Sequence, residues 1–233
     1  MARAPYGQTP WQTVGPFFHF GLPWSGCADL TGHSGIGARP DLMPTGRQAL
    51  RGPDVRPPEP SPRGERIEIN GRVFDAQGVP VPDALLEIWQ ANANGQYRGS
   101  AAFPRDDPAD DPAGEVDLAF FGFGRAATAE NGSFCFRTLR PGRVPFAAGH
   151  RPLQAPHIAL GVQGRGLLKR LVTRIYFADE SSNAEDPILA RVPEHRRATL
   201  LAERVDAPHA GAAASYRFDV HLQGARETVF FEW

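Results

Sequence analysis

The chain has 233 residues, of which 41% are hydrophobic, and this size and composition fit one well-buried globular domain, or two small ones, and exclude a disordered chain. Its formal net charge of −1 excludes a general electrostatic attraction to nucleic acid or anionic lipid. No apolar run reaches the roughly 18 residues of a membrane helix, and the start MARAPYGQTP lacks a signal-peptide core, so we expect a cytoplasmic protein with neither nucleic acid nor membrane as partner.

Glycine, proline and cysteine usage narrows the fold class. The 25 glycines and 23 prolines interrupt the chain too often for long helices, which favours a turn-rich, mainly β domain. The two cysteines, Cys27 and Cys135, lie far apart and belong to no CxxC motif or Cys/His cluster. We therefore expect buried thiols, with neither a disulfide scaffold nor a structural zinc site.

The first part of the chain, residues 1–64, has no periodic hydrophobic pattern. Residues 1–24 are aromatic and broken by proline, so they are too apolar for a free tail and too interrupted for a helix. Residues 25–64 are rich in Gly, Pro and Arg and suggest an irregular covering loop. We expect residues 1–64 to form an arm and loop that pack on the core or on a partner chain.

Residues 65–233 predict an all-β fold, an antiparallel β-sandwich with long loops and one short helix, so that the chain is a single structural domain. The helix is predicted within residues 193–205, where Pro193 suits a first turn. Residues 100–117 are predicted as a solvent loop, residues 118–124 as a domain or partner contact, and residues 227–231 as a strand or a docked terminal arm. Strands are predicted over residues 67–73, 82–90, 133–139, 156–162, 171–177 and 216–222.

A long stretch, GRVFDAQGVPVPDALLEIWQANANGQY at residues 71–97, resembles the signature of the intradiol ring-cleavage dioxygenases. Further stretches resemble the members of this family that cleave protocatechuate: TPWQTVGPFFHFGLPW near the start, RTLRPG, PHIALGV, TRIYF, and YRFDVHLQGARETVFFEW at the end. The resemblance spans nearly the whole chain and is weakest over residues 28–64 and 100–117. It implies cleavage of protocatechuate by O2 to 3-carboxy-cis,cis-muconate, with neither NADH nor flavin.

The resemblance also implies an iron site, which this sequence keeps only in part. Catalytic members hold Fe(III) with two tyrosines and two histidines, because the hard ferric ion favours anionic phenolate oxygen. The matching positions here are Tyr97, Val144, His157 and Ala159, and neither valine nor alanine has a donor atom. We expect a vestigial site without metal and no catalytic residue in this chain alone. The Fe(III) of the assembled enzyme is then bound by a homologous beta chain, in a higher-order alpha-beta oligomer.

The resemblance further implies that four residues of this chain border the iron pocket of the partner and bind the substrate carboxylate: Thr13, Gly15, Pro16 and Arg165. Such a loop is chemically reasonable. Thr13 offers a hydroxyl, Gly15 permits close approach of the backbone, Pro16 fixes the loop, and Arg165 can form charge-assisted hydrogen bonds with a carboxylate.

Simpler roles stay open for each of these residues. Tyr97 and His157 can be ordinary packed or hydrogen-bonded groups, Arg165 a solvated loop residue, and ThrValGlyPro a packed arm that only stabilises the dimer. Arg125 and Arg174 are interpreted as structural ion-pair or hydrogen-bond residues. Two other functions also stay open, namely a self-sufficient intradiol enzyme with substitute ligands and a β-sandwich binding or assembly module that serves no dioxygenase.

Overall fold

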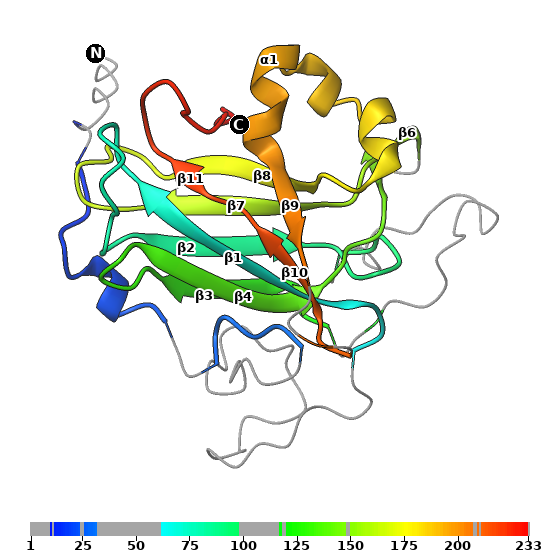
Figure 1. Cartoon of the computed structure of the whole chain (residues 1–233), viewed down its shortest axis with the longest axis horizontal. Coiled ribbons are helices and arrows are strands. Elements are labelled where there is room, and N and C mark those ends of the chain that lie inside the picture. Colours follow the sequence, from blue (N-terminus) through cyan, green and yellow to red (C-terminus); the bar gives the residue numbers. More distant parts are fainter. Residues whose placement is uncertain are drawn as a thin grey trace, which may run out of the picture.

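The computed structural model describes residues 10, 12–23, 26–31, 62–97, 117, 120–147, 150–206, 209 and 211–232. Strands dominate these residues, and the helices among them are single turns (Figure 1). The strands are β1 (Arg66–Phe74), β2 (Leu85–Gln90), β3 (Phe123–Ala127), β4 (Ser133–Leu139), β5 (Val144–Ala147), β6 (His150–Gln154), β7 (His157–Gln163), β8 (Leu171–Phe177), β9 (Leu201–Val205), β10 (Ala214–Arg217) and β11 (Val220–His221). The helices are the 3-10 turns η1 (Phe18–Phe20), η6 (Ser181–Glu185), η7 (Leu189–Arg191) and η8 (Ala198–Leu200), and the α-helix α1 (Glu194–Arg197).

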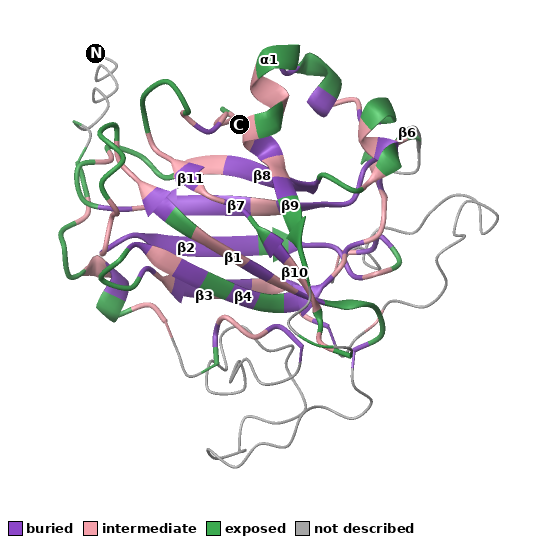
Figure 2. Cartoon of the chain, in the orientation of Figure 1, coloured by how far each residue is buried: buried purple, intermediate pink, exposed green. Residues whose placement is uncertain are grey.

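The strands form a β-sandwich, as the sequence predicts. One layer contains β1, β4 and β10, the other contains β3, β2, β7 and β8, and β9 pairs with both β10 and β8. The inward-facing side chains of the two layers make one hydrophobic cluster, in which Ile67, Phe136, Leu86, Leu160 and Phe177 are each 1% exposed or less. Figure 2 shows the buried residues concentrated along the strands of this interior.

Most pairs between the described strands are antiparallel, but three are parallel. Strand β1 pairs in parallel with β10 and with β11, and β8 pairs in parallel with β9. Parallel neighbours need a crossover connection, and the segment from η6 to η8 supplies the one between β8 and β9. A separate two-stranded ribbon, β5 with β6, lies next to the start of β7.

The predicted strands over residues 67–73, 82–90, 133–139, 156–162 and 171–177 are confirmed as β1, β2, β4, β7 and β8. In β4, the alternation works as predicted, because Phe134, Phe136 and Thr138 are all buried. Cys135 points the other way and is exposed, so the expectation of two buried thiols is wrong for this residue. Cys27 is buried, and the two sulfurs form no disulfide.

The prediction of a helix over residues 193–205 is only partly correct. The α-helix covers Glu194–Arg197, a 3-10 turn follows to Leu200, and Leu201–Val205 is strand β9. The residues are strong helix formers, but the backbone of β9 completes the sheet by pairing with both β8 and β10. Tertiary pairing therefore overrides local propensity in the second half of this segment.

The predicted strand at residues 216–222 is divided into β10 and β11. The break occurs where the chain crosses Gly71 of β1, because a Cβ at Gly71 would lie 1.8 Å from the carbonyl oxygen of Phe218. The side chain of Asp219 replaces the missing ladder bond by accepting from the Arg72 N–H at 3.0 Å.

Two of the apolar segments contribute side chains or hydrogen bonds to this chain's own fold, whereas Phe17 and Phe20 of the N-terminal segment are exposed. Phe120 belongs to the core, so the predicted contact segment 118–124 contributes to the interior rather than only to a domain or partner contact. The C-terminal residues form a docked arm, in which the Phe231 N–H donates to the Val172 carbonyl at 2.8 Å. The predicted solvent loop 100–117 lies outside the described residues except for Asp117.

The described parts of the N-terminal region lie along the edge of the sandwich. Leu30 is buried in the core, and its N–H donates to the Arg137 carbonyl of β4 at 2.8 Å. Residues 12–23, drawn in blue in Figure 1, run past the end of the sheet at which β7 turns into β8. Most of the predicted covering loop 25–64 lies outside the described residues.

The close crossing at Gly71 predicts a specific stability effect. Gly71→Ala places a methyl group against the Phe218 carbonyl, and the overpacking should cost about 1–3 kcal/mol of unfolding free energy. The matched control is Gly164→Ala, whose Cβ would meet its nearest neighbours at 3.9 Å and should change stability by less than about 0.5 kcal/mol. Urea unfolding of the two variants checks this, and equal effects would contradict the crossing.

Candidate functional site

The candidate site residues lie on the outer face of the layer that contains β2, β7 and β8. Side chains alternate along a strand, so while Ile158 and Leu160 of β7 enter the core, His157 and Ala159 face away from it. The register places Ala159 between Trp89 of β2 and Arg174 of β8. Two groups of residues, at opposite ends of this face, are relevant to function.

The first group, called the inner site below, contains the four predicted ligand positions Tyr97, Val144, His157 and Ala159, together with Arg174. Tyr97 follows β2 in a tight turn, and its ring stacks on Trp89 with 5.8 Å between the ring centroids. Val144 pairs across the β5–β6 ribbon with Gln154. The fold therefore brings the predicted positions to one end of the sheet, where β7 begins.

Arg174 places a positive charge inside the inner site. The residue is 8% exposed, and its Nη1 donates to Gln154 Oε1 at 2.7 Å and to the Tyr176 hydroxyl at 3.3 Å. The interpretation of Arg174 as a hydrogen-bonded structural residue is thus confirmed. The sequence alone does not place Arg174 beside the ligand positions, because that placement follows from the pairing of Ala159 with Arg174.

Asp186 anchors the network around this guanidinium. It is fully buried, and Oδ1 accepts from the Tyr176 hydroxyl at 3.2 Å and from the Leu189 N–H at 2.7 Å. Oδ2 accepts from the Ala155 N–H at 2.7 Å, two residues before His157. The Tyr176 hydroxyl therefore links a buried carboxylate to a buried guanidinium, and burial raises the pKa of this hydroxyl. Sequence reasoning missed Asp186, which lies in a loop without periodicity.

His157 is held as a neutral imidazole. It is 4% exposed, and its Nδ1 lies 2.8 Å from the Ala155 carbonyl oxygen. A carbonyl oxygen only accepts, so Nδ1 carries the proton and Nε2 the lone pair. Burial, and then the charge of Arg174, lower the pKa of His157 to about 4. Burial raises the pKa of Tyr97, against a smaller opposing effect of Arg174, so this phenol keeps its proton at neutral pH.

The inner site does not fit a ferric ion. Only Tyr97 and His157 offer donor atoms at the four ligand positions, and the guanidinium of Arg174 contributes a positive charge where a metal would need negative ligands. Among the described residues, no group of three or more His, Cys, Asp or Glu side chains is placed to hold a metal. The positive charge at this end of the sheet is that of Arg174, a side chain of this protein, rather than that of a metal ion.

The second group, called the outer site below, contains Thr13, Gly15, Pro16 and Arg165. The Thr13 hydroxyl lies 3.5 Å from the carbonyl oxygen of Gly164, which brings the N-terminal segment next to the turn that carries Arg165. Thr13, Gly15 and Pro16 are exposed. A Cβ at Gly15 would meet nothing within 4 Å, so close approach of another part of the described chain is not the reason for this glycine.

The inner and outer sites cannot act on one small molecule within a single chain. His157 begins β7, and Arg165 lies two residues beyond its last residue, Gln163. The six steps along the strand from His157 to Gln163 span about 20 Å, which is far longer than a substituted benzene ring. The structure brings Thr13 and Arg165 together and separates both from Tyr97 and His157.

Arg125 and its neighbours occupy the middle of the same face. The Arg125 Nε lies 2.7 Å from Glu87 Oε1, which confirms the interpretation of Arg125 as an ion-pair residue. Its Nη1 also donates to the Leu22 carbonyl at 3.4 Å and so ties the N-terminal segment to the sheet. Arg170 adds a second ion pair to Glu87 at 3.2 Å.

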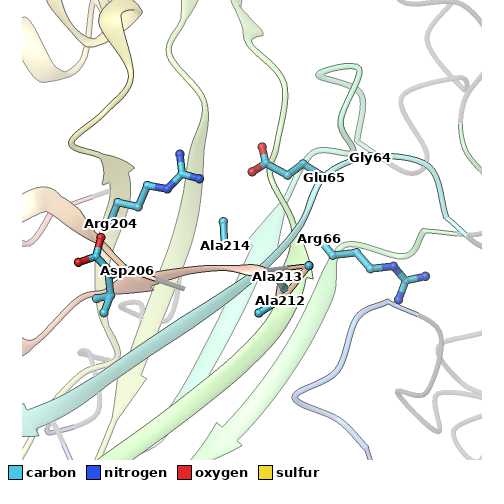
Figure 3. Close-up of a pocket in the computed structure, with 10 residues that line it drawn as sticks. Gly64, Glu65, Arg66, Arg204, Asp206, Ala212, Ala213 and Ala214 are labelled. Carbon is cyan, nitrogen blue, oxygen red and sulfur yellow. The ribbon is translucent and has the colours of Figure 1, made fainter. Parts of the chain in front are cut away.

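A hollow of about 610 Å³ lies elsewhere, between β1, β9 and β10 (Figure 3). Charged side chains from two sides, among them Glu65, Arg66, Arg204 and Asp206, border it. None of the predicted site residues lines this hollow.

Comparison with known proteins identifies relatives over almost the whole chain. A family model described as "Dioxygenase" matches residues 40–224. The protocatechuate 3,4-dioxygenase alpha chains of Burkholderia cepacia and Pseudomonas putida are 40% and 36% identical, each over 97% of this chain, and the alignments cover 97% and 96% of those proteins. The beta chain of the Burkholderia cepacia enzyme is 37% identical, over 72% of this chain and 68% of that one.

A solved structure supports the fold. The catechol 1,2-dioxygenase of Acinetobacter sp. ADP1 superposes with a TM-score of 0.52 and 25% identity, over 70% of this chain and 54% of that one.

No helix among the described residues is long and apolar enough to cross a membrane.

The buried neutral His157 predicts a pH dependence of stability. The pKa is about 4 in the folded chain, against an ordinary value of about 6.5, so the unfolded chain binds the proton more readily. The contribution of neutral His157 to the free energy of unfolding is complete above pH 6.5, decreases as the pH falls, and is lost below pH 4. The total change is about 3 kcal/mol. Urea unfolding between pH 7.5 and 4 should show that the free energy of unfolding depends less steeply on pH in His157→Gln than in the unchanged chain. Identical slopes would mean that His157 does not titrate as described.

Proposed function

The chain belongs to the intradiol dioxygenase family, and on this premise we propose that it is the alpha subunit of a protocatechuate 3,4-dioxygenase. The observation that carries the proposal is the inner site, where Val144 and Ala159 lack donor atoms. Arg174 is buried there, opposite Ala159 and hydrogen-bonded to Gln154, the residue that pairs with Val144. A chain with this pocket needs a partner that provides the iron. The likeness to both an alpha and a beta chain supports a homologous, iron-bearing beta chain as that partner.

In the proposed assembly, the outer site faces the iron pocket of the partner. The side chain of Arg165 is 59% exposed, so its guanidinium is accessible to a group outside this chain. Thr13, Gly15 and Pro16 are also exposed, and Thr13 lies next to the turn that carries Arg165. We propose that these residues bind the carboxylate of protocatechuate and orient its ring, and that residues 1–64 pack against the partner as well as on the core made by residues 65–233.

The reaction is the cleavage of protocatechuate between its two hydroxylated carbons, with both atoms of O2 entering 3-carboxy-cis,cis-muconate. Substrate oxidation supplies the electrons, so no external reductant is needed. Fe(III) bound by the beta chain supplies the oxidative chemistry, and the contribution of this chain is to bind and orient the aromatic acid. Two cysteines that form no disulfide fit a reducing compartment, and we propose that the assembly works in the cytoplasm.

A co-expression experiment tests the alpha-chain assignment. The chain produced alone should be colourless, free of iron and inactive, because the inner site cannot hold the metal. Co-expression with a beta chain that has two tyrosines and a His-X-His motif should give a complex with about one iron per beta chain. Metal analysis and oxygen uptake with protocatechuate measure both results.

The outcomes of co-expression separate the other functions. Stoichiometric iron and activity in the chain alone would show a self-sufficient enzyme with substitute ligands. If co-expression with each beta chain tried fails to give activity, the chain is a binding or assembly module instead. Either result would contradict the alpha-chain proposal.

Loss of Arg165 should change substrate preference. Arg165→Ala in the assembled enzyme removes charge-assisted hydrogen bonds to the carboxylate, so KM for protocatechuate should rise about 10- to 100-fold. Catechol has no carboxylate, and its KM should stay within about twofold. Steady-state oxygen uptake with both substrates checks this, and an unchanged preference would exclude a carboxylate-binding role for Arg165.

A further inference from the structure

Asp83 contacts Arg165 of the outer site, and its role is inferred here on the basis of the proposed function. We infer that Asp83 is a positioning residue that fixes the guanidinium of Arg165 for recognition of the substrate carboxylate. Asp83 itself touches no substrate, and its effect passes through Arg165.

The register of the sheet brings the two residues together. Leu85 of β2 pairs with Gln163 of β7 in an antiparallel ladder. Two steps backwards along one strand and two forwards along the other place Asp83 opposite Arg165, just beyond the ladder. The Arg165 Nε lies 2.9 Å from Asp83 Oδ2. Both residues belong to turns, so the ion pair joins two loops at the end of the sheet where Thr13 also lies.

The environments of the two charges are unequal. The side chain of Asp83 is 8% exposed, whereas that of Arg165 is 59% exposed. Within the described part of the chain, neither carboxylate oxygen of Asp83 has a hydrogen bond of good geometry, and Arg165 is the cation beside it. A buried carboxylate without a counter-charge is strongly unfavourable, so Asp83 holds the arginine at this position.

The shape of the guanidinium allows it to bind a second carboxylate at the same time. Arginine has five N–H groups in a planar fork, of which a single one is on Nε. Asp83 contacts the Nε, so the terminal nitrogens remain available for a bidentate pair with another carboxylate. Fixing one edge of the plane orients the other edge, and the entropy of ordering the long side chain is then lost on folding rather than on substrate binding.

The experiment uses the assembled enzyme with its iron-bearing partner, and compares Asp83→Asn, Arg165→Ala and the double variant. Asparagine keeps the shape of aspartate but lacks its charge, so thermal unfolding should change little. KM for protocatechuate should rise about three- to tenfold in Asp83→Asn, with kcat and the KM for catechol within about twofold. In the Arg165→Ala background, Asp83→Asn should have no further effect on KM, because the residue through which it acts is absent.

The matched control is Glu68→Gln. Arg137 Nε lies 2.9 Å from Glu68 Oε1, the same distance between Nε and a carboxylate oxygen as in the Arg165 pair, but on a different strand pair. Glu68→Gln should leave both KM values unchanged.

The outcomes distinguish this inference from the function on which it rests. An unchanged KM in Arg165→Ala would sink the proposed carboxylate role and the inference with it. A raised KM in Arg165→Ala with an unchanged or lowered KM in Asp83→Asn would overturn the positioning role alone. An equal effect of Asp83→Asn with and without Arg165 would also overturn it, since Asp83 would then act by another route.

Discussion

The hydrogen bonds of the buried Arg174 guanidinium are the interaction on which the arrangement of the inner site depends. A buried cation must be hydrogen-bonded, and here Gln154 and Tyr176 accept from it, with Asp186 fixed behind Tyr176. The same charge helps to keep His157 neutral. The position of the family's metal site is therefore organised in this chain around the guanidinium of Arg174, whose positive charge does not fit a ferric ion beside it.

The length of strands β7 and β8 separates the inner site from Arg165. Strands β7 and β8 carry the inner site at one end and the turn with Arg165 at the other, about 20 Å apart. An arginine at that distance cannot serve the pocket of its own chain, but its exposed guanidinium can serve a pocket placed against it. The missing donor atoms at Val144 and Ala159, and the exposed arginine beside Asp83, both support the proposed pairing of two homologous chains.

Hydrophobic alternation predicted the sandwich, because each layer buries one face and strand patterns record that burial directly. It failed where long-range pairing decides the backbone. Residues 193–205 have helical propensity yet end in β9, and the strand at 216–222 breaks at Gly71. The chemistry of Arg174 and Asp83 was missed for a related reason. Both act across a strand pair or its extension, and a single sequence contains the residues but not the register.

Iron-edge anomalous diffraction from crystals of the chain bound to its proposed iron-bearing partner would show which of the two chains holds the metal. We expect one iron peak for each pair of chains, inside the partner and within reach of a substrate held by Arg165. We expect no peak between Tyr97 and His157, and the guanidinium of Arg174 should be hydrogen-bonded to Gln154 and Tyr176 there. An iron peak at that position, with the guanidinium displaced, would contradict the account.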